Sequence, residues 1–327
     1  MSAPIDDILV IKFSALGDVL MAFPAFARIR AAHPAARITL LTTPLFAGLA
    51  GASPYFDRVE SDGRPGDLVG WLRLVWRLRR ARYQRVYDLQ TNDRTNLLFQ
   101  ALRPRPPAWS GVAEGCALPH RNKARMTMHS LERHAEQLMH AGIWPDAPVR
   151  PGAGAPPDLG WILAGQPAEA TAKRAPVVLI PGSAPHRPEK RWPANFYGVL
   201  AERLVALGHA VVIVGTAPER PLADAIRRRA PGARDLTGTT SLEQLAALGA
   251  RAALVVGNDT GPTHLLAAAG APTLVLFSSA SDPALSAPRG AVRVLRAPRL
   301  ENLPLETVLA AALAGLESSP RENSATL

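Results

Sequence analysis

Short apolar runs alternate with longer amphipathic stretches along the first half of the chain. A short apolar run between turn residues is typical of a strand, and apolar positions spaced three and four apart are typical of a helix. The runs predict strands at Ile8–Phe13, Arg37–Thr42, Arg58–Glu60 and Arg85–Leu89. The amphipathic stretches predict helices at Val19–Ala32, Leu68–Arg80, Arg94–Leu102 and Ser130–Ala141.

The alternation starts again after residues 150–176, where Pro, Gly and Ala are crowded. Such a stretch holds neither a long helix nor a central strand. We therefore predict one domain at 1–155, a second at 156–316 and a disordered polar tail at 317–327. In the second domain the pattern predicts strands at Val177–Ile180, Ala210–Val214, Leu254–Val256, Thr273–Phe277 and Val292–Leu295. It predicts helices around Trp161 and at Asn195–Leu207, Leu222–Arg229, Ser241–Leu248, Thr263–Ala269 and Pro304–Leu316.

Strands and helices that alternate through short polar connections predict an α/β fold, with each half a doubly wound parallel sheet covered on both faces. Two such domains in succession are expected to face a cleft. Ligands of doubly wound sheets bind at the carboxyl ends of the strands, so the loops after the strands are the place to look for chemistry.

Composition narrows the class of protein. The chain has 327 residues, 47% of them hydrophobic, which is enough to build sizeable cores. A single cysteine, Cys116, excludes an internal disulfide framework and a cysteine-rich metal cage. Asp6 and Asp7 stand where a signal peptide would carry basic residues, and no apolar stretch reaches about 18 residues. We therefore expect a cytoplasmic protein.

The net charge of +10 is unevenly distributed. Residues 64–125 contain 13 basic and 4 acidic side chains. A basic field of this kind attracts anionic partners, which include nucleic acid, acidic lipid headgroups and phosphorylated substrates. No nucleic-acid-binding motif accompanies the charge, so nucleic acid is the least supported of these three classes of partner.

Several familiar motifs are absent from the sequence. It contains no G-x-G-x-x-G, no P-loop, no H-E-x-x-H and no G-x-S-x-G. It also has no Asp-x-Asp pair that would seat a divalent metal. His129, His134 and His140 form a cluster, but their spacing does not stack them on one helical face, which favours a role on a helix surface over a metal site.

The first candidate site is the segment from Lys12 to Asp18 after the first predicted strand. Gly17 permits a tight turn and close approach of a ligand. Asp18 falls at a helix start that faces the expected cleft, where it is either a helix cap or a catalytic carboxylate.

Two further candidates follow strands of the second domain. After Pro181-Gly182-Ser183 come Lys190 and Arg191, which form either an anion cradle or an exposed basic loop. Asp259, Thr260, Gly261 and His264 lie between a buried strand and a helix of small residues. Backbone amides after Gly261 can point at a phosphate, although a helix cap and a structural histidine are the simpler alternatives.

Two weaker signals complete the set. Glu219, in the loop after Ala210–Val214, is placed to accept ribose hydroxyls or to start a helix. Arg73, Arg77 and Arg80 share one face of the predicted helix at Leu68–Arg80. We expect its core side to include Leu68, Leu72, Val75 and either Leu78 or Arg79. Such an arginine stripe is usually a solvated face, but the local charge and two tryptophans favour an interfacial or phosphate-binding surface.

Together these segments resemble glycosyltransferase family 9, the ADP-heptose:lipopolysaccharide heptosyltransferases. The matching segments run in family order from residue 8 to about residue 283. They are Lys12–Val19, Asp88-Leu89-Gln90 with Arg94, Pro181–Ser183 with Lys190–Pro193, Leu236–Leu242 and Asn258–Ala269. After Phe277 the chain has Ser278, where the family commonly has Gly.

The resemblance implies two Rossmann-like domains of the glycosyltransferase B type and an inverting transfer of heptose that needs no metal and no cofactor. It implies that Asp18 is the general base and that the acceptor is a phosphorylated lipid A or core oligosaccharide at the cytoplasmic face of the inner membrane. The donor-binding residues it implies are Ser183, Lys190, Glu219, Asp259, Thr260, Gly261 and His264. The acceptor-binding residues are Ser14, Gly17, Gln90, Arg94, Arg73 and Arg77.

Two alternatives remain at the level of sequence. A nucleotide-sugar epimerase of the same fold would act on the donor alone. A non-catalytic protein that binds nucleotide sugars would keep the pocket without turnover, although such a protein has no need of both Asp18 and Lys190.

Overall fold

The computed structural model describes residues 5–164 and 175–318. The chain divides into two compact units, unit 1 at Met1–Pro157 and unit 2 at Asp158–Leu327, and each is described by itself. The sequence places the boundary two residues earlier, between 155 and 156. Of the tail expected at 317–327, Glu317 ends a helix and residues 319–327 lie outside the described parts.

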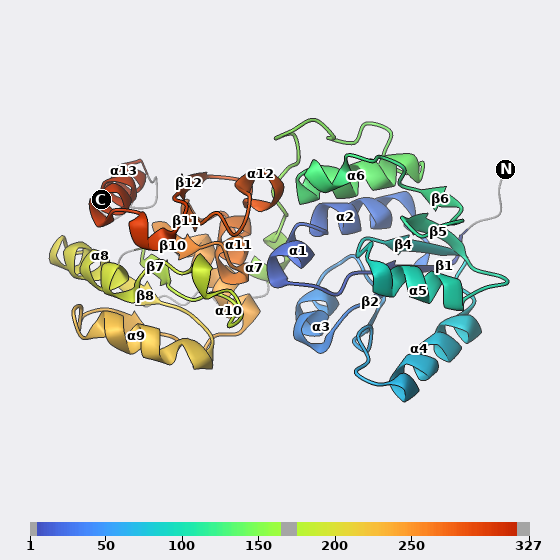
Figure 1. The fold of residues 1–327 in the computed structure, drawn as a ribbon, viewed down its shortest axis with the longest axis horizontal. Coiled ribbons are helices and arrows are strands. Elements are labelled where there is room, and N and C mark those ends of the chain that lie inside the picture. Colours follow the sequence, from blue (N-terminus) through green and yellow to red (C-terminus); the bar gives the residue numbers. More distant parts are fainter. Residues whose placement is uncertain (1–4, 165–174, 319–327) are drawn as a thin grey trace. The chain divides into compact units, whose positions relative to one another are not determined.

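Unit 1 is built on a parallel sheet in the order β3-β2-β1-β4-β5-β6. Figure 1 shows α2 and α6 over one face and α4 and α5 over the other. Its strands are β1 (Asp7–Ile11), β2 (Arg37–Leu41), β3 (Arg58–Glu60), β4 (Arg85–Asp88), β5 (Ala108–Gly111) and β6 (Leu118–Pro119). Its helices are α1 (Leu16–Leu20), α2 (Phe23–Ala32), α3 (Pro44–Gly51), α4 (Leu68–Ala81), α5 (Asp93–Ala101) and α6 (Ser130–His140).

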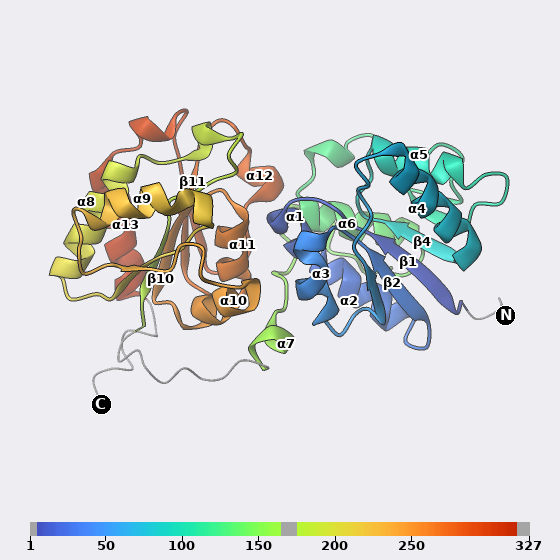
Figure 2. The ribbon, with the colours of Figure 1, turned by 90° about the horizontal axis from the view of Figure 1, so that it is seen from below.

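Unit 2 repeats this plan with the order β12-β11-β10-β7-β8-β9, again all parallel. Figure 2 shows α8, α9 and α13 on one side of the sheet and α10 and α11 on the other. Its strands are β7 (Val177–Ile180), β8 (Val211–Ile213), β9 (Arg234–Asp235), β10 (Leu254–Asn258), β11 (Thr273–Phe277) and β12 (Val292–Arg296). Its helices are α7 (Gly160–Leu163), α8 (Ala194–Ala206), α9 (Arg220–Arg227), α10 (Leu242–Arg251), α11 (Gly261–Ala268), α12 (Pro283–Ser286) and α13 (Leu305–Glu317).

The central strands of both sheets are almost entirely buried, as their unbroken apolar runs require. The α/β class with two doubly wound parallel sheets is therefore confirmed. None of the helices in the described residues is long and apolar enough to cross a bilayer.

Three local predictions are wrong. The helix expected at Val19–Ala32 is two helices, α1 and α2, separated at Met21 and Ala22. Pro24 accounts for the new start, because proline lacks an N–H and fits only the first turn of a helix, where it stands in α2. The strands β5 and β6 are short and were not predicted from the pattern.

The second error concerns α4. Leu74, Val75 and Leu78 are buried on the sheet, but Leu68 and Leu72, which were expected in the core, are 70% and 58% exposed. The apolar residues cover a wider arc of this helix than the sheet can bury, so the sequence alone does not show which part of that arc faces the core.

The third error concerns the histidines. His140 is exposed at the end of α6, as expected, but His129 and His134 are buried. His134 Nε2 lies 3.4 Å from the Nζ of Lys12 on the loop after β1, a contact between residues 122 positions apart in the chain.

Candidate functional site

The two groups of predicted site residues lie at matching positions in the two sheets. In unit 1 the chain leaves β1 toward β2 and leaves β4 toward β5, so strand order reverses between β1 and β4. In unit 2 it reverses between β7 and β10. Loops diverge at such a switch point, and ligands of doubly wound sheets bind there.

At the switch point of unit 1, Gln90 joins the two loops. Its Oε1 accepts hydrogen bonds from the backbone N–H groups of Phe13 at 2.8 Å and Ser14 at 3.2 Å. Its Nε2 donates to Ser14 Oγ at 3.0 Å. Gln90 is in turn held by Asp88, whose Oδ1 accepts from the Gln90 N–H at 3.0 Å. The predicted residues Ser14 and Gln90 are thus brought together, and their contact orders the loop that leads to Gly17 and Asp18.

Asp18 lies in the first turn of α1 and is partly exposed. The cap residue of α1, Ala15, has no side chain with which to cap the helix, and Gly17 directly precedes the carboxylate. The side chain therefore stands at a helix start beside the switch point, as the sequence predicts.

A buried cation lies beneath this loop. Lys12 is 4% exposed and donates to the carbonyl of Leu89 at 3.1 Å. Burial lowers the pKa of Lys12 to about 8, and the charge of Asp18 opposes that shift. Burial, with the charge of Lys12, also lowers the pKa of His134 well below its usual value, so this imidazole is neutral beside the ammonium group.

Two partly buried arginines near the unit 1 switch point were not found from the sequence, and the charge of one of them, Arg133, interacts with that of Asp18. Burial lowers the pKa of the Arg133 guanidinium, while the charge of Asp18 raises it. Arg133 Nη2 donates to Ser130 Oγ at 3.2 Å, and Arg125 Nη2 donates to Thr91 Oγ1 at 2.6 Å. The signal available in the sequence was the basic segment that ends at Arg125, although Arg133 lies beyond it.

The three arginines that the sequence predicts to bind the acceptor lie on α4 and α5. Arg77 is already engaged in ion pairs of 2.7 Å with Glu60 and Asp62. Arg73 is exposed, and Arg94 Nη1 donates to the carbonyl of Pro65 at 3.3 Å. Their role in binding stays a prediction.

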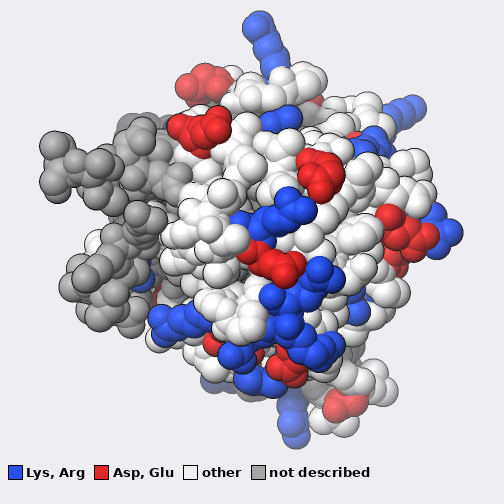
Figure 3. Space-filling view, turned by 90° about the vertical axis from the view of Figure 1, so that its left-hand side faces the viewer, with Lys and Arg blue, Asp and Glu red and all other residues white. Residues whose placement is uncertain are grey.

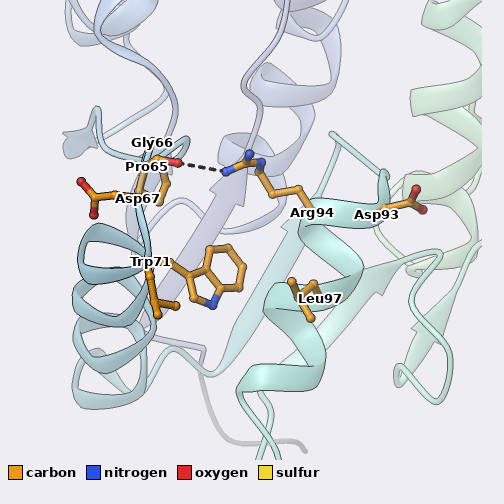
Figure 4. Close-up of a pocket in the computed structure, with 8 residues that line it drawn as sticks. Pro65, Gly66, Asp67, Trp71, Asp93, Arg94 and Leu97 are labelled. Atoms are coloured by element: carbon orange, nitrogen blue, oxygen red, sulfur yellow. Dashed lines mark hydrogen bonds between the residues drawn. The ribbon is translucent and has the colours of Figure 1, made fainter.

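Arg94 borders a shallow groove of about 520 Å³ between the first turns of α4 and α5. In Figure 4 the indole of Trp71 lies between the two helices with Leu97 opposite, while the carboxylates of Asp67 and Asp93 point away. The groove is lined by Pro65, Gly66, Asp67, Leu68, Trp71, Asp93, Arg94 and Leu97.

At the switch point of unit 2, Asn258 joins the end of β10 to the loop after β7. Its Nδ2 donates to the carbonyls of Pro181 at 2.9 Å and Gly182 at 3.1 Å. Its Oδ1 accepts from the backbone N–H of Trp192 at 3.1 Å. These bonds fix the loop that carries Lys190 against the start of α11.

Asp259, the next residue, contacts three side chains through its carboxylate. Its Oδ2 lies 2.5 Å from Lys190 Nζ and accepts from Ser281 Oγ at 2.6 Å, and its Oδ1 lies 3.2 Å from His264 Nε2. Burial alone would raise the pKa of Asp259, but hydrogen bonds from His264, Lys190 and Ser281 hold it well below its usual range. The carboxylate is therefore ionised at any physiological pH. Ser281 belongs to the segment after Phe277, in which the sequence departs from its family pattern.

The remaining residues predicted to bind the donor surround this cluster or the neighbouring loop. Thr260 caps α11 without a side-chain cap bond, and Gly261 is the first helical residue. Ser183 is buried, donates to the carbonyl of Arg187 at 2.8 Å and accepts from Arg191 Nε at 3.0 Å. It therefore orders the basic loop.

Glu219 lies beside the loop after β7 and closes a capping box. Its Oε2 accepts from the N–H of Thr216 at 2.6 Å and from Thr216 Oγ1 at 2.8 Å. A Cβ on Gly182 would come within 1.6 Å of Glu219 Oε1, so a glycine is needed there for the carboxylate to lie against the backbone. Both alternatives from the sequence, a helix start and a ribose ligand, are compatible with this position.

No group of three or more His, Cys, Asp or Glu side chains within residues 5–164 and 175–318 is arranged to hold a metal ion. The positive charge at the unit 2 switch point comes from Lys190, from Arg187 and Arg191 in the same loop, and from the start of α11.

Comparison with known proteins places these features in context. The model of glycosyltransferase family 9 (heptosyltransferase) matches residues 71–302, a range that includes Lys190 and Asp259 but not Asp18. The chain is 27% identical to lipopolysaccharide heptosyltransferase 2 of Salmonella typhimurium over 315 residues, and to the Escherichia coli protein of the same name over 314 residues. Each alignment covers 88% of both chains.

A solved structure with the same fold is that of E. coli ADP-heptose lps heptosyltransferase II. It superposes with a TM-score of 0.77 at 24% identity, over 95% of this chain and 98% of that one. At this level of identity, the likeness establishes a shared architecture.

Proposed function

This chain belongs to glycosyltransferase family 9 (heptosyltransferase) and is a glycosyltransferase, and from that premise we propose that it transfers heptose from ADP-heptose to a lipopolysaccharide core acceptor. The observation that carries the proposal is the contact of Lys190, His264 and Ser281 with Asp259 at the unit 2 switch point. Asp259 thereby holds the Lys190 ammonium group close to the start of α11, at the position where a nucleotide sugar would bind.

The donor diphosphate would lie against Lys190 and the first amides of α11. A helix N-terminus carries partial positive charge, and a lysine supplies a full one. Because leaving ADP gains negative charge as its bond to the sugar breaks, this arrangement would stabilise the transition state in the role that a divalent metal plays in other transferases. We therefore propose a reaction that requires no metal ion.

The acceptor would react at Asp18. The Asp18 carboxylate removes the proton of an acceptor hydroxyl while the oxygen attacks the anomeric carbon. The new carbon–oxygen bond forms as the bond to the ADP oxygen breaks, and ADP leaves with that electron pair. A single displacement of this kind inverts the configuration at the anomeric carbon.

Arg133 and Lys12 would support this step as positioning residues, because the charges of both interact with that of Asp18. Ser14, Gly17 and Gln90 order the loop that presents the carboxylate. We further propose a phosphorylated lipid A or core oligosaccharide as acceptor, met at the cytoplasmic face of the inner membrane, with Arg73 and Arg94 among its contacts.

The proposal is tested by incubating the purified protein with ADP-heptose and purified core acceptors, with and without a chelator. Mass spectrometry of the acceptor should show one added heptose in both conditions, and NMR should show the inverted anomeric configuration. Release of free sugar or an epimer without acceptor would favour an epimerase. Tight ADP-heptose binding without any product would favour a non-catalytic binding protein.

A further inference from the structure

The outer face of α4 carries a line of exposed apolar side chains. Leu68, Leu72 and Trp76, spaced four residues apart, are 70%, 58% and 63% exposed, and Val69 beside them is 56% exposed. Residues at this spacing lie above one another on a helix. Burying leucine and tryptophan side chains away from water is favourable in free energy. A continuous line of them on a surface therefore indicates a contact site.

The apolar line continues across the groove to α5. Trp71 and Leu97 lie on opposite sides of that groove, and Leu97 is 59% exposed (Figure 4). The carboxylates of Asp67 and Asp93 point away from it. The apolar surface therefore includes the N-terminal halves of two neighbouring helices.

Positive charge flanks the apolar line. The sequence of α4 contains four arginines and no acidic residue. Arg73 and Arg80 are exposed, and the Arg80 guanidinium lies 5.5 Å from the centre of the Trp76 ring. An apolar face that carries tryptophan and is edged by arginine is typical of helices that lie in the interface of an anionic bilayer.

We propose that α4 docks unit 1 on an anionic membrane surface, with Leu68, Leu72 and Trp76 entering the headgroup region and Arg73 and Arg80 contacting lipid phosphates. The inference deepens the proposed function, because a lipid-linked acceptor would be met at such a surface. The contact depends on the apolar line first, and the arginines add attraction to anionic headgroups.

Unit 2 supplies matched controls. Leu207, just beyond α8, is 59% exposed, and Arg203 and Arg227 are exposed on α8 and α9. Figure 3, which shows the molecule from the side of unit 2, has its Lys and Arg side chains mixed with Asp and Glu. Leu207→Ser removes one exposed leucine and Arg203→Gln/Arg227→Gln removes two positive charges, in both cases without touching α4.

The test is flotation of the full chain with vesicles of phosphatidylethanolamine and phosphatidylglycerol, compared with vesicles of phosphatidylcholine. The double variant Leu72→Ser/Trp76→Ser should lose binding to anionic vesicles by about tenfold or more, since each side chain leaves water on docking. Arg73→Gln/Arg80→Gln should weaken binding and reduce its salt dependence. Leu207→Ser and Arg203→Gln/Arg227→Gln should bind as the parent does.

A second readout locates the contact. Brominated lipids should quench part of the tryptophan fluorescence of the parent, and Trp76→Phe should reduce that part while keeping vesicle binding. Unchanged binding by Leu72→Ser/Trp76→Ser, or an equal loss in Leu207→Ser, would overturn the proposal. The proposal would also be overturned if the parent did not bind vesicles but formed dimers, and the double variant Leu72→Ser/Trp76→Ser were monomeric.

Failure of docking and failure of the proposed function give different results. Leu72→Ser/Trp76→Ser should transfer heptose to a water-soluble, delipidated acceptor at the parent rate. If the parent itself shows no transfer but binds anionic vesicles through α4, the proposed function fails and the docking surface stands.

Discussion

Lys190 Nζ lies 2.5 Å from Asp259 Oδ2, so the ammonium group proposed to bind the donor diphosphate is held by a carboxylate of its own domain. The pair is largely buried, with 17% of the lysine side chain and 7% of the aspartate side chain exposed. Asp259 restricts the flexible lysine near the start of α11 before any donor arrives. Order of this kind reduces the conformational entropy that binding must otherwise remove.

Replacing Lys190 by Gln is expected to weaken ADP binding by about tenfold to a hundredfold, the usual effect of losing a charge-assisted hydrogen bond. Isothermal titration with ADP measures the change. Arg203→Gln, on the exposed surface of α8, is the control for the loss of one positive charge. Equal affinities for ADP in the parent and in Lys190→Gln would remove Lys190 from the donor site.

Replacing Asp18 by Asn is expected to lower the turnover number by about 10²–10⁴-fold, the usual contribution of a general base. ADP affinity should stay unchanged, because Lys190 and Asp259 belong to the other unit. Asp93→Asn, in the first turn of α5, is the matched control for an acidic residue at a helix start. Turnover of Asp18→Asn near that of Asp93→Asn would exclude the proposed role.

The feature that the sequence predicts well is the position of the candidate residues after buried strands. Asp18 and Asp259 follow unbroken apolar runs, and each stands beside a switch point, where the connections of two adjacent strands leave in opposite directions. This part of the prediction needed only strand order along the chain.

Contacts between distant residues could not be predicted in this way. His134 is buried in contact with Lys12, 122 residues earlier in the chain, and the third hydrogen-bonded partner of Asp259 is Ser281, 22 residues later. The exposed face of α4 is set by how the helix packs on the sheet, because its leucine, valine and tryptophan residues cover a wider arc than the sheet buries. In each case the packing of distant segments determines which side chains are buried and which are in contact, and the local sequence pattern does not show this.

Asp88 gives a prediction about stability and pH. Burial raises the pKa of Asp88 to about 6, against hydrogen bonds from the N–H groups of Thr91 and Gln90 that favour the charged form. A carboxyl group whose pKa is higher in the folded state binds more protons there, so its stabilisation is complete at low pH and is lost as pH rises through about 6. The shift from 3.8 corresponds to at most about 3 kcal/mol.

The free energy of unfolding of the parent should therefore lose this contribution between pH 4 and pH 7, and Asp88→Asn should remove that part of the pH dependence. Urea unfolding followed by tryptophan fluorescence at several pH values measures it. Asp93→Asn, an exposed carboxylate nearby, should leave the dependence as in the parent. A parent and an Asp88→Asn variant with parallel pH profiles would contradict the shift.

The close approach of Glu219 to Gly182 yields a test of whether the glutamate binds the donor or only caps a helix. A methyl group at Gly182 would overlap Glu219 Oε1, so Gly182→Ala should displace the carboxylate and break its capping box with Thr216. The loss of a cap costs about 1 kcal/mol of stability. If Glu219 holds the ribose, Gly182→Ala and Glu219→Ala should each weaken ADP binding.

The double variant Gly182→Ala/Glu219→Ala should then bind ADP no more weakly than Glu219→Ala alone, because both changes remove the same contact. Gly48→Ala is the control for a new methyl group, since nothing lies within 4 Å of its Cβ, and within α3 it should stabilise the protein by about 0.5–1 kcal/mol. Stability losses without any change in ADP affinity would assign Glu219 to the capping box alone. A ribose ligand at this position would move both quantities together, because one carboxylate serves the helix and the nucleotide.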